Sequence, residues 1–227
     1  IVAAVGLVAA RAIPSLGARA PALAVSRNPF SGTFGLLREG MRDRRLRPIY
    51  LLVSWFWFLG AGLLSVVAPF CRATFGDDPR IASIFLAAFS VGIALGAALS
   101  PTLVAALGRL RAVRASAGAM ALGLAVVAIL PKVAGTASVV AHFAGFVLVA
   151  AAGGTYAVPL ITELQLRSAE DRRARNVATN NVLNALAMVL VSGFLPALYA
   201  LDFGYSAVLV CFAGTAAVVA LLARWGE

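Results

Sequence analysis

Three asparagines recur at every fourth position in the stretch 151–189. Asn176, Asn180 and Asn184 therefore share one face of a predicted helix. An asparagine side chain both donates and accepts hydrogen bonds, and such a row in lipid is costly unless it faces other helices or a water-filled cavity. Two interpretations follow and stay open: hydrogen bonding between helices, or the lining of a pathway through a membrane.

Ionisable side chains gather next to this row. Arg172, Arg173 and Arg175 precede it, and they could enforce membrane topology, recognise a phosphate or contribute to a gate. Glu163 is the one acidic residue that we place inside a predicted span, a few residues before the basic turn. We favour an ion pair between Glu163 and a nearby arginine, with cation or proton binding as the alternative.

Aromatic and small residues point to two other roles. Trp55 and Trp57 lie several residues inside a predicted span, deeper than the usual interfacial belt, so they either line a cavity or pack between helices. Gly92 and Gly96 form a small-xxx-small pattern, which predicts that this face packs closely against another helix.

No group of residues points to catalysis. His142 is the only histidine, and no carboxylate pair or nucleophile with an adjacent base is present. We interpret His142 as a packing residue or one near the outer interface. Cys71 and Cys211 fall on different segments without metal-ligand spacing. We therefore expect neither an enzyme nor a metal or cofactor site.

The elements that position these residues are helices in a bilayer. The chain has 227 residues, is 62% hydrophobic and 12% charged, and has a mean hydropathy of +0.95, outside the range of a soluble domain of this size. Apolar runs of about 20 residues recur between short polar breaks. The predicted elements are a partial span at 1–13, a polar connection at 14–47, and a six-helix bundle over 48–227 with spans at 48–70, 81–107, 113–130, 139–166, 176–201 and 205–222. Pro196 is expected to break the fifth of these spans.

The net charge of +10 indicates orientation more than nucleic-acid binding, because the basic residues lie in the breaks and no soluble basic face is present. Sixteen of the 19 basic residues fall on one side when successive breaks alternate. Basic loops mark the cytoplasmic side. The predicted cytoplasmic loops contain Arg42, Arg111 and Arg173, and the predicted external loops contain Asp77, Gly135 and Asp202.

The polar connection contains an amphipathic stretch. Its apolar side chains at helical spacing are Phe34, Leu37 and Met41, and the arginines on another face are Arg38, Arg42 and Arg45. This pattern is typical of a short helix that lies on an anionic leaflet. A solvated linker with a fraying helix is the alternative.

Four segments resemble the C-terminal half of the bacterial lysophospholipid transporter branch of the major facilitator superfamily. They are SWFWFLGAG (54–62), FLAAFSVGIALGAALS (85–100), GGTYAVPL (153–160) and RRARNVATNNVLNALAMV (172–189). They occur in the family's order, and the interval from the first to the last of them, 54–189, covers most of the chain. The element NNVLNAL is the most distinctive of them.

The resemblance implies an all-α membrane fold of twelve helices in two bundles. This chain would hold part of the sixth helix and the last six, and an N-terminal six-helix half would be its partner. The implied activity is the flipping of lysophospholipids across the bacterial inner membrane for re-acylation, with a fused or separate acyltransferase. Trp57, Tyr156, Asn180 and Asn184 would then bind the substrate, the amides contacting its headgroup and the rings its acyl chain. An exporter of drugs or other small amphiphiles, and the membrane part of a fused acyltransferase, are the alternatives.

Overall fold

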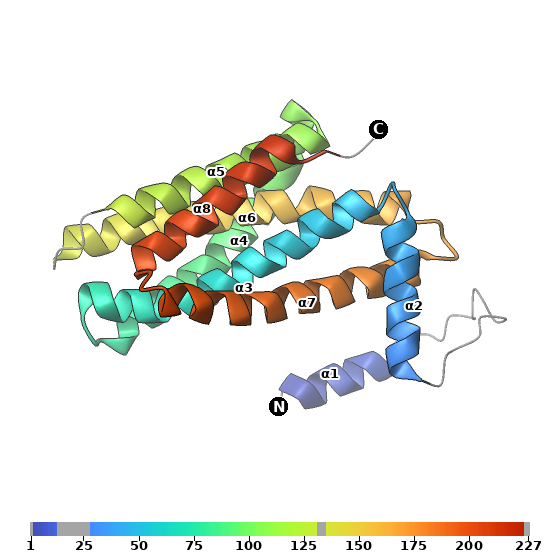
Figure 1. Cartoon of the computed structure of the whole chain (residues 1–227), viewed down its shortest axis with the longest axis horizontal. Coiled ribbons are helices and arrows are strands. Elements are labelled where there is room, and N and C mark those ends of the chain that lie inside the picture. Colours follow the sequence, from blue (N-terminus) through green and yellow to red (C-terminus); the bar gives the residue numbers. More distant parts are fainter. Residues whose placement is uncertain (1, 13–27, 131–134, 225–227) are drawn as a thin grey trace.

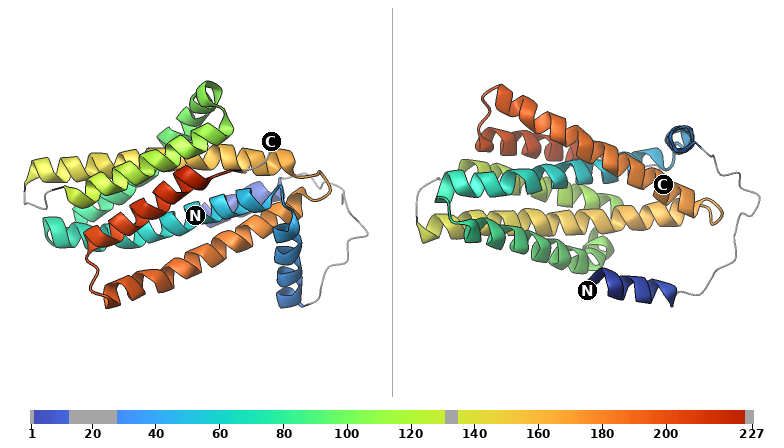
Figure 2. Two further views of the ribbon diagram at one scale, coloured as in Figure 1. Left: turned by 45° about the horizontal axis from the view of Figure 1, so that its top comes forward. Right: turned by 90° about the horizontal axis from the view of Figure 1, so that it is seen from below.

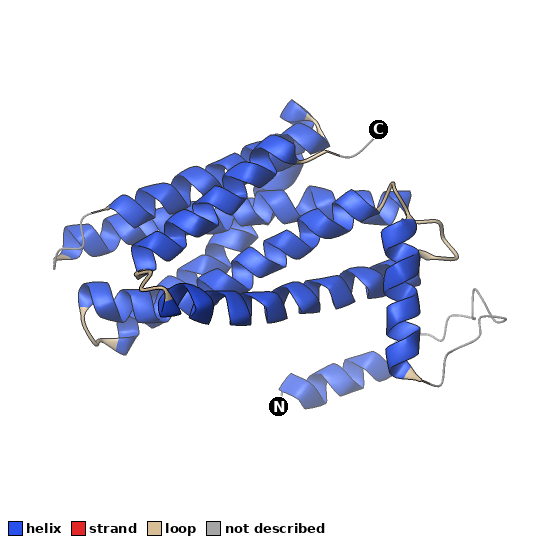
Figure 3. Ribbon diagram, in the orientation of Figure 1, coloured by secondary structure: helices blue, strands red, loops and turns tan. Residues whose placement is uncertain are grey.

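The computed structural model describes residues 2–12, 28–130 and 135–224, and over these residues the chain is helical without strands (Figure 3). The helices are α1 (Val2–Arg11), α2 (Pro29–Arg42), α3 (Arg47–Phe75), α4 (Pro79–Leu107), α5 (Arg109–Ile129), α6 (Thr136–Arg167), α7 (Arg173–Ala200) and α8 (Tyr205–Leu222). Of the described helices, α3 to α8 are each long and apolar enough to cross a membrane. The predicted all-α class is therefore confirmed over the described residues, and each of the six predicted complete spans corresponds to a helix that could cross a membrane. Residues 1 and 13–27 of the predicted partial span and connection, and Lys132, lie outside the described residues.

Local sequence explains where the helices begin and end. Asn28 and Asp78 cap α2 and α4 with their side-chain oxygens, and each is followed by a proline at the first helical position. Such prolines lack a backbone N–H where the helix has no acceptor for one. Gly108, with φ of 79°, ends α4 and lets α5 start at the next residue.

Three helices differ clearly from the sequence prediction. α3 extends to Phe75, beyond the predicted end at residue 70, so Arg72 lies in its last turn. α5 begins at Arg109 and not at residue 113, so its first arginines belong to the helix and not to a break, because arginine is a good helix former. α7 runs without interruption through Pro196 to Ala200, so the predicted break there is wrong. Proline removes one backbone donor, but in lipid the other backbone groups of the helix have no water to bond and keep their helical bonds.

The spanning helices pack in a crossed pattern. α4 lies along α6 and α7 lies along α3, while α5 packs against both α6 and α8 (Figures 1 and 2). The first three spans and the last three are thus interleaved. The second helix of each triplet packs against the first helix of the other.

The two ends of this bundle differ in charge. One end holds the starts of α3, α5 and α7 and the last turns of α4, α6 and α8, and we call it the basic end because most of the described arginines lie there. Side chains link these helix ends to one another. Arg109 of α5 donates to Glu163 of α6 over 3.0 Å, and Arg114 of α5 donates to the Ala220 carbonyl of α8 over 2.9 Å.

Candidate functional site

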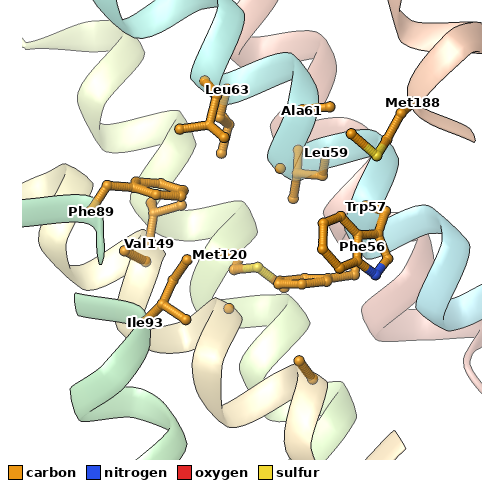
Figure 4. Close-up of a pocket in the computed structure, with 15 residues that line it drawn as sticks. Phe56, Trp57, Leu59, Ala61, Leu63, Phe89, Ile93, Met120, Val149 and Met188 are labelled. Atoms are coloured by element: carbon orange, nitrogen blue, oxygen red, sulfur yellow. The ribbon is translucent and has the colours of Figure 1, made fainter. Parts of the chain in front are cut away.

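A cavity of about 320 Å³ lies inside the bundle between α3, α4 and α6, with one methionine each from α5 and α7 (Figure 4). Trp57 and Met188 lie on one side of it, and Phe89 and Ile93 on the other. The remaining walls are formed by Phe56, Leu59, Gly60, Ala61, Leu63, Leu64, Met120, Val149, Ala150, Gly153 and Ala157. Its volume is at the lower end of the range for small-molecule pockets in proteins.

The cavity lies at mid-depth and is apolar. Its α3 residues, 56–64, lie roughly 14 to 26 Å along a helix about 43 Å long, measured from Arg47. All the lining side chains are apolar or aromatic, apart from the indole N–H of Trp57. Trp57 and Met188 are 43% and 42% exposed, so they mark the open side of the cavity. Chemically, the cavity suits a hydrocarbon chain or an aromatic group and offers little to a charged headgroup.

Of the four residues predicted to contact substrate, Trp57 lines this cavity and Tyr156 lies behind its wall. Tyr156 is fully buried, and its hydroxyl donates to the Leu52 carbonyl over 3.1 Å. Its ring stacks on Phe56 with 6.0 Å between centroids and meets Trp55 edge-on at 5.3 Å. Tyr156 therefore supports Phe56, which does line the cavity. Trp55 faces elsewhere, because its indole N–H donates to Thr215 of α8 over 3.3 Å.

The asparagine row lies along the interface between α7 and its neighbours and does not line the cavity. At Asn184 the structure shows hydrogen bonding between helices, since the Ser54 hydroxyl of α3 donates to its side-chain oxygen over 3.2 Å. Asn176 donates to the Ser168 hydroxyl over 2.9 Å. Asn180 is buried, and its side-chain oxygen has no partner among the described residues.

The predicted gating and topology residues form two ion clusters at the basic end. Glu163 is 5% exposed and accepts from Arg167 over 2.5 Å in addition to Arg109. The pairing favoured for Glu163 from sequence is thus the observed geometry. Arg172 and Arg175 both donate to Glu39 of α2, over 3.3 and 2.5 Å. Arg173 is exposed.

The two glycines of the small-residue pattern lie against α6. A Cβ on Gly92 would come within 2.7 Å of the Ala150 Cβ, and a Cβ on Gly96 would overlap the Ala151 carbonyl. The reverse contact is equally close, because a Cβ on Gly154 would overlap the Ile93 carbonyl of α4. This backbone-to-backbone approach fixes α6 beside α4 and so forms one side of the cavity.

Most of the residues that line the cavity cannot be identified from the sequence. Met120, Met188 and Phe89 carry no signal of their own in the sequence, because each is a single apolar residue on an apolar helix. The adjacent aromatic residues Phe56 and Trp57 are the one sequence feature that indicates the cavity. Consecutive residues in a helix lie on neighbouring faces, so two large rings can line adjacent parts of one wall.

The other chemistry-bearing residues are packed or separate. His142 is fully buried, its Nδ1 lies 2.8 Å from the Ser138 carbonyl oxygen, and its ring contacts Phe70 and Phe75. The two cysteines are not joined. Within the described ranges, no group of three or more His, Cys, Asp or Glu side chains could hold a metal ion.

Comparisons with known proteins add no relative. No family model, curated protein or solved structure matches this chain.

Proposed function

We propose that this chain is the C-terminal six-helix bundle of a major facilitator transporter, and that the whole protein moves a lysophospholipid across a bacterial inner membrane by alternating access. The packing of the spans supports the superfamily. The triplets α3–α5 and α6–α8 enter from opposite ends, and each places its second helix against the first helix of the other. Inverted triplets of this kind are nested within each half of a major facilitator protein.

The observation that carries the cargo is the apolar cavity. A lysophospholipid has one acyl chain. A mid-depth cavity lined by Trp57, Phe56 and aliphatic side chains could hold this chain while the headgroup lies outside the cavity. Contacts with the headgroup would come from polar residues elsewhere, including the N-terminal half that the proposal requires. Rocking of the two halves would expose the open side, at Trp57 and Met188, to each face of the membrane in turn.

The test is lysophospholipid flipping by the full-length protein in liposomes, compared at matched amounts of folded protein. Ala157→Phe places a ring in the cavity and should lower the flipping rate at least tenfold. Ala144→Phe is the matched control, because it lies on the same helix at an exposed position one turn before Leu148. A wild-type rate for Ala157→Phe would remove the cavity from the transport path.

The same cavity also supports export of small apolar molecules. Met120 and Met188 are flexible, polarisable side chains, which adapt to ligands of different shape. A full-length protein that failed to flip lysophospholipids, yet extruded a hydrophobic dye in a manner sensitive to Ala157→Phe, would establish this second function in place of the first.

A further inference from the structure

α2 lies across the basic end of the bundle, steeply inclined to the spanning helices. The right-hand view of Figure 2 shows α2 end-on and the spanning helices from the side. Its C-terminal half is docked on α7: Glu39 pairs with Arg172 and Arg175, Gly40 lies against Thr179, and the Thr179 hydroxyl is 3.5 Å from the Leu36 carbonyl oxygen. These contacts hold α2 across the ends of the spanning helices at the basic end.

The N-terminal half of α2 extends past α7 (Figure 1). This half carries Phe30 and Phe34, whose side chains are 85% and 70% exposed although both are large and apolar. The two rings are one helical turn apart and so share a face. The helix start is well formed, because the Asn28 side chain accepts from the Phe30 N–H over 2.9 Å and Pro29 follows it.

Positive charge continues the same row. Arg38 and Arg42 follow Phe34 at intervals of four residues. Each lies about 40° further around the helix than the one before, so the arginines lie beside the aromatic face. Both arginines are exposed. The one acidic side chain of α2, Glu39, is directed to α7 by its two arginine partners and leaves the flank basic.

We propose that α2 binds the anionic lipid leaflet at the basic end, with Phe30 and Phe34 at the boundary between headgroups and acyl chains and with Arg38 and Arg42 on the lipid phosphates. Six helices long enough to cross a membrane put this end at a bilayer surface, and a helix lying across it whose exposed aromatic row continues into two exposed arginines matches the chemistry of that surface. The proposal concerns the membrane alone and holds for any cargo.

The experiment uses the full-length protein in nanodiscs with or without phosphatidylglycerol. A nitroxide is attached at Phe34→Cys in a variant whose native cysteines are replaced by alanine, and its collisions with oxygen, which enters lipid, and with a water-soluble nickel chelate are compared. Gly35→Cys is the matched control, since a side chain there meets open space and points about 100° away from position 34. We expect a severalfold higher oxygen-to-nickel ratio at position 34 than at position 35 in anionic discs.

The charge dependence separates membrane binding from other burial. Arg38→Gln with Arg42→Gln should weaken local binding by more than tenfold, because each arginine near an anionic surface contributes about fivefold. Arg72→Gln with Arg80→Gln removes the same charge at the opposite end and should leave the ratio unchanged. Equal ratios at positions 34 and 35 in anionic discs would overturn the proposal. An unchanged oxygen-to-nickel ratio at position 34 after Arg38→Gln with Arg42→Gln would also overturn it. So would a position 34 that neither oxygen nor the nickel chelate reaches, because this would show that protein covers this face.

Discussion

Ser54 of α3 and Asn184 of α7 are hydrogen-bonded to each other inside the bundle, 130 residues apart in sequence and 3.2 Å apart in space. This bond ties together two helices that run in the same direction from the basic end. Hydrogen bonds between membrane helices average about 0.6 kcal/mol in mutant cycles. A double-mutant cycle of Ser54→Ala and Asn184→Ala should therefore give a coupling of about 0.6 kcal/mol in the free energy of unfolding, and additive effects would show that the bond contributes nothing.

The hydroxyl of Tyr156 gives a second prediction. Tyr156→Phe removes its bond to the Leu52 carbonyl and keeps the ring against Phe56, so the protein should lose about 1 kcal/mol of stability. Transport should stay near the wild-type rate, because the hydroxyl does not reach the cavity. Trp57→Ala is the comparison variant, and it should lower the transport rate clearly while changing the melting temperature little. A loss of transport in Tyr156→Phe together with a wild-type rate in Trp57→Ala would place Tyr156, not Trp57, on the substrate path.

Gly96 is expected to tolerate no side chain. Gly96→Leu forces the α4 backbone away from the Ala151 carbonyl of α6, and overpacking against a backbone that cannot yield should cost about 3 kcal/mol or more. Gly193→Leu on α7 makes the same change where a Cβ meets nothing within 4 Å. Folded yield by size-exclusion chromatography should fall for Gly96→Leu alone. Similar yields for the two variants would contradict the close contact.

The two glutamates at the basic end should differ in their contribution to stability. Glu163 is buried between Arg109 and Arg167, so Glu163→Gln leaves a half-buried positive pair without its counter-charge and should destabilise the protein by about 1–3 kcal/mol. Glu39 forms ion pairs in which all three side chains are more than a third exposed, and Glu39→Gln should cost less than about 1 kcal/mol. Thermal unfolding in detergent measures both, and an equal loss would show that burial does not decide the effect.

Orientation stays a prediction that labelling can test. In a variant whose native cysteines, Cys71 and Cys211, are replaced by alanine, Arg173→Cys and Asp77→Cys place single thiols at exposed positions on opposite ends of the bundle. The distribution of arginines predicts that an impermeant reagent added to intact cells labels position 77 and spares position 173. Labelling of position 173 alone would invert the orientation and would move α2 to the outer leaflet.

The spanning helices were predictable because the bilayer fixes both their length and their composition. Runs of about 20 apolar residues suffice to find them, although arginines at the ends, such as Arg109, join the helix and shift its boundary. The site was predictable only in part. The spacing of Asn180 and Asn184 identifies their common helix face, but it does not say whether that face meets another helix or a cavity. At Asn184 the answer depends on Ser54, which belongs to a distant span.

The interleaving of the two helix triplets has a consequence for biosynthesis. The side of α3 that holds Ser54 is covered by α7, which leaves the ribosome about 130 residues later. At 5–20 residues per second, α3 waits roughly 7 to 26 seconds in the membrane before its partner exists. During that interval the Ser54 hydroxyl can bond to a carbonyl of its own helix, as the Ser65 hydroxyl does to the Ala61 carbonyl over 2.9 Å. The bond from Ser54 to Asn184 therefore replaces a local bond once α7 has been inserted.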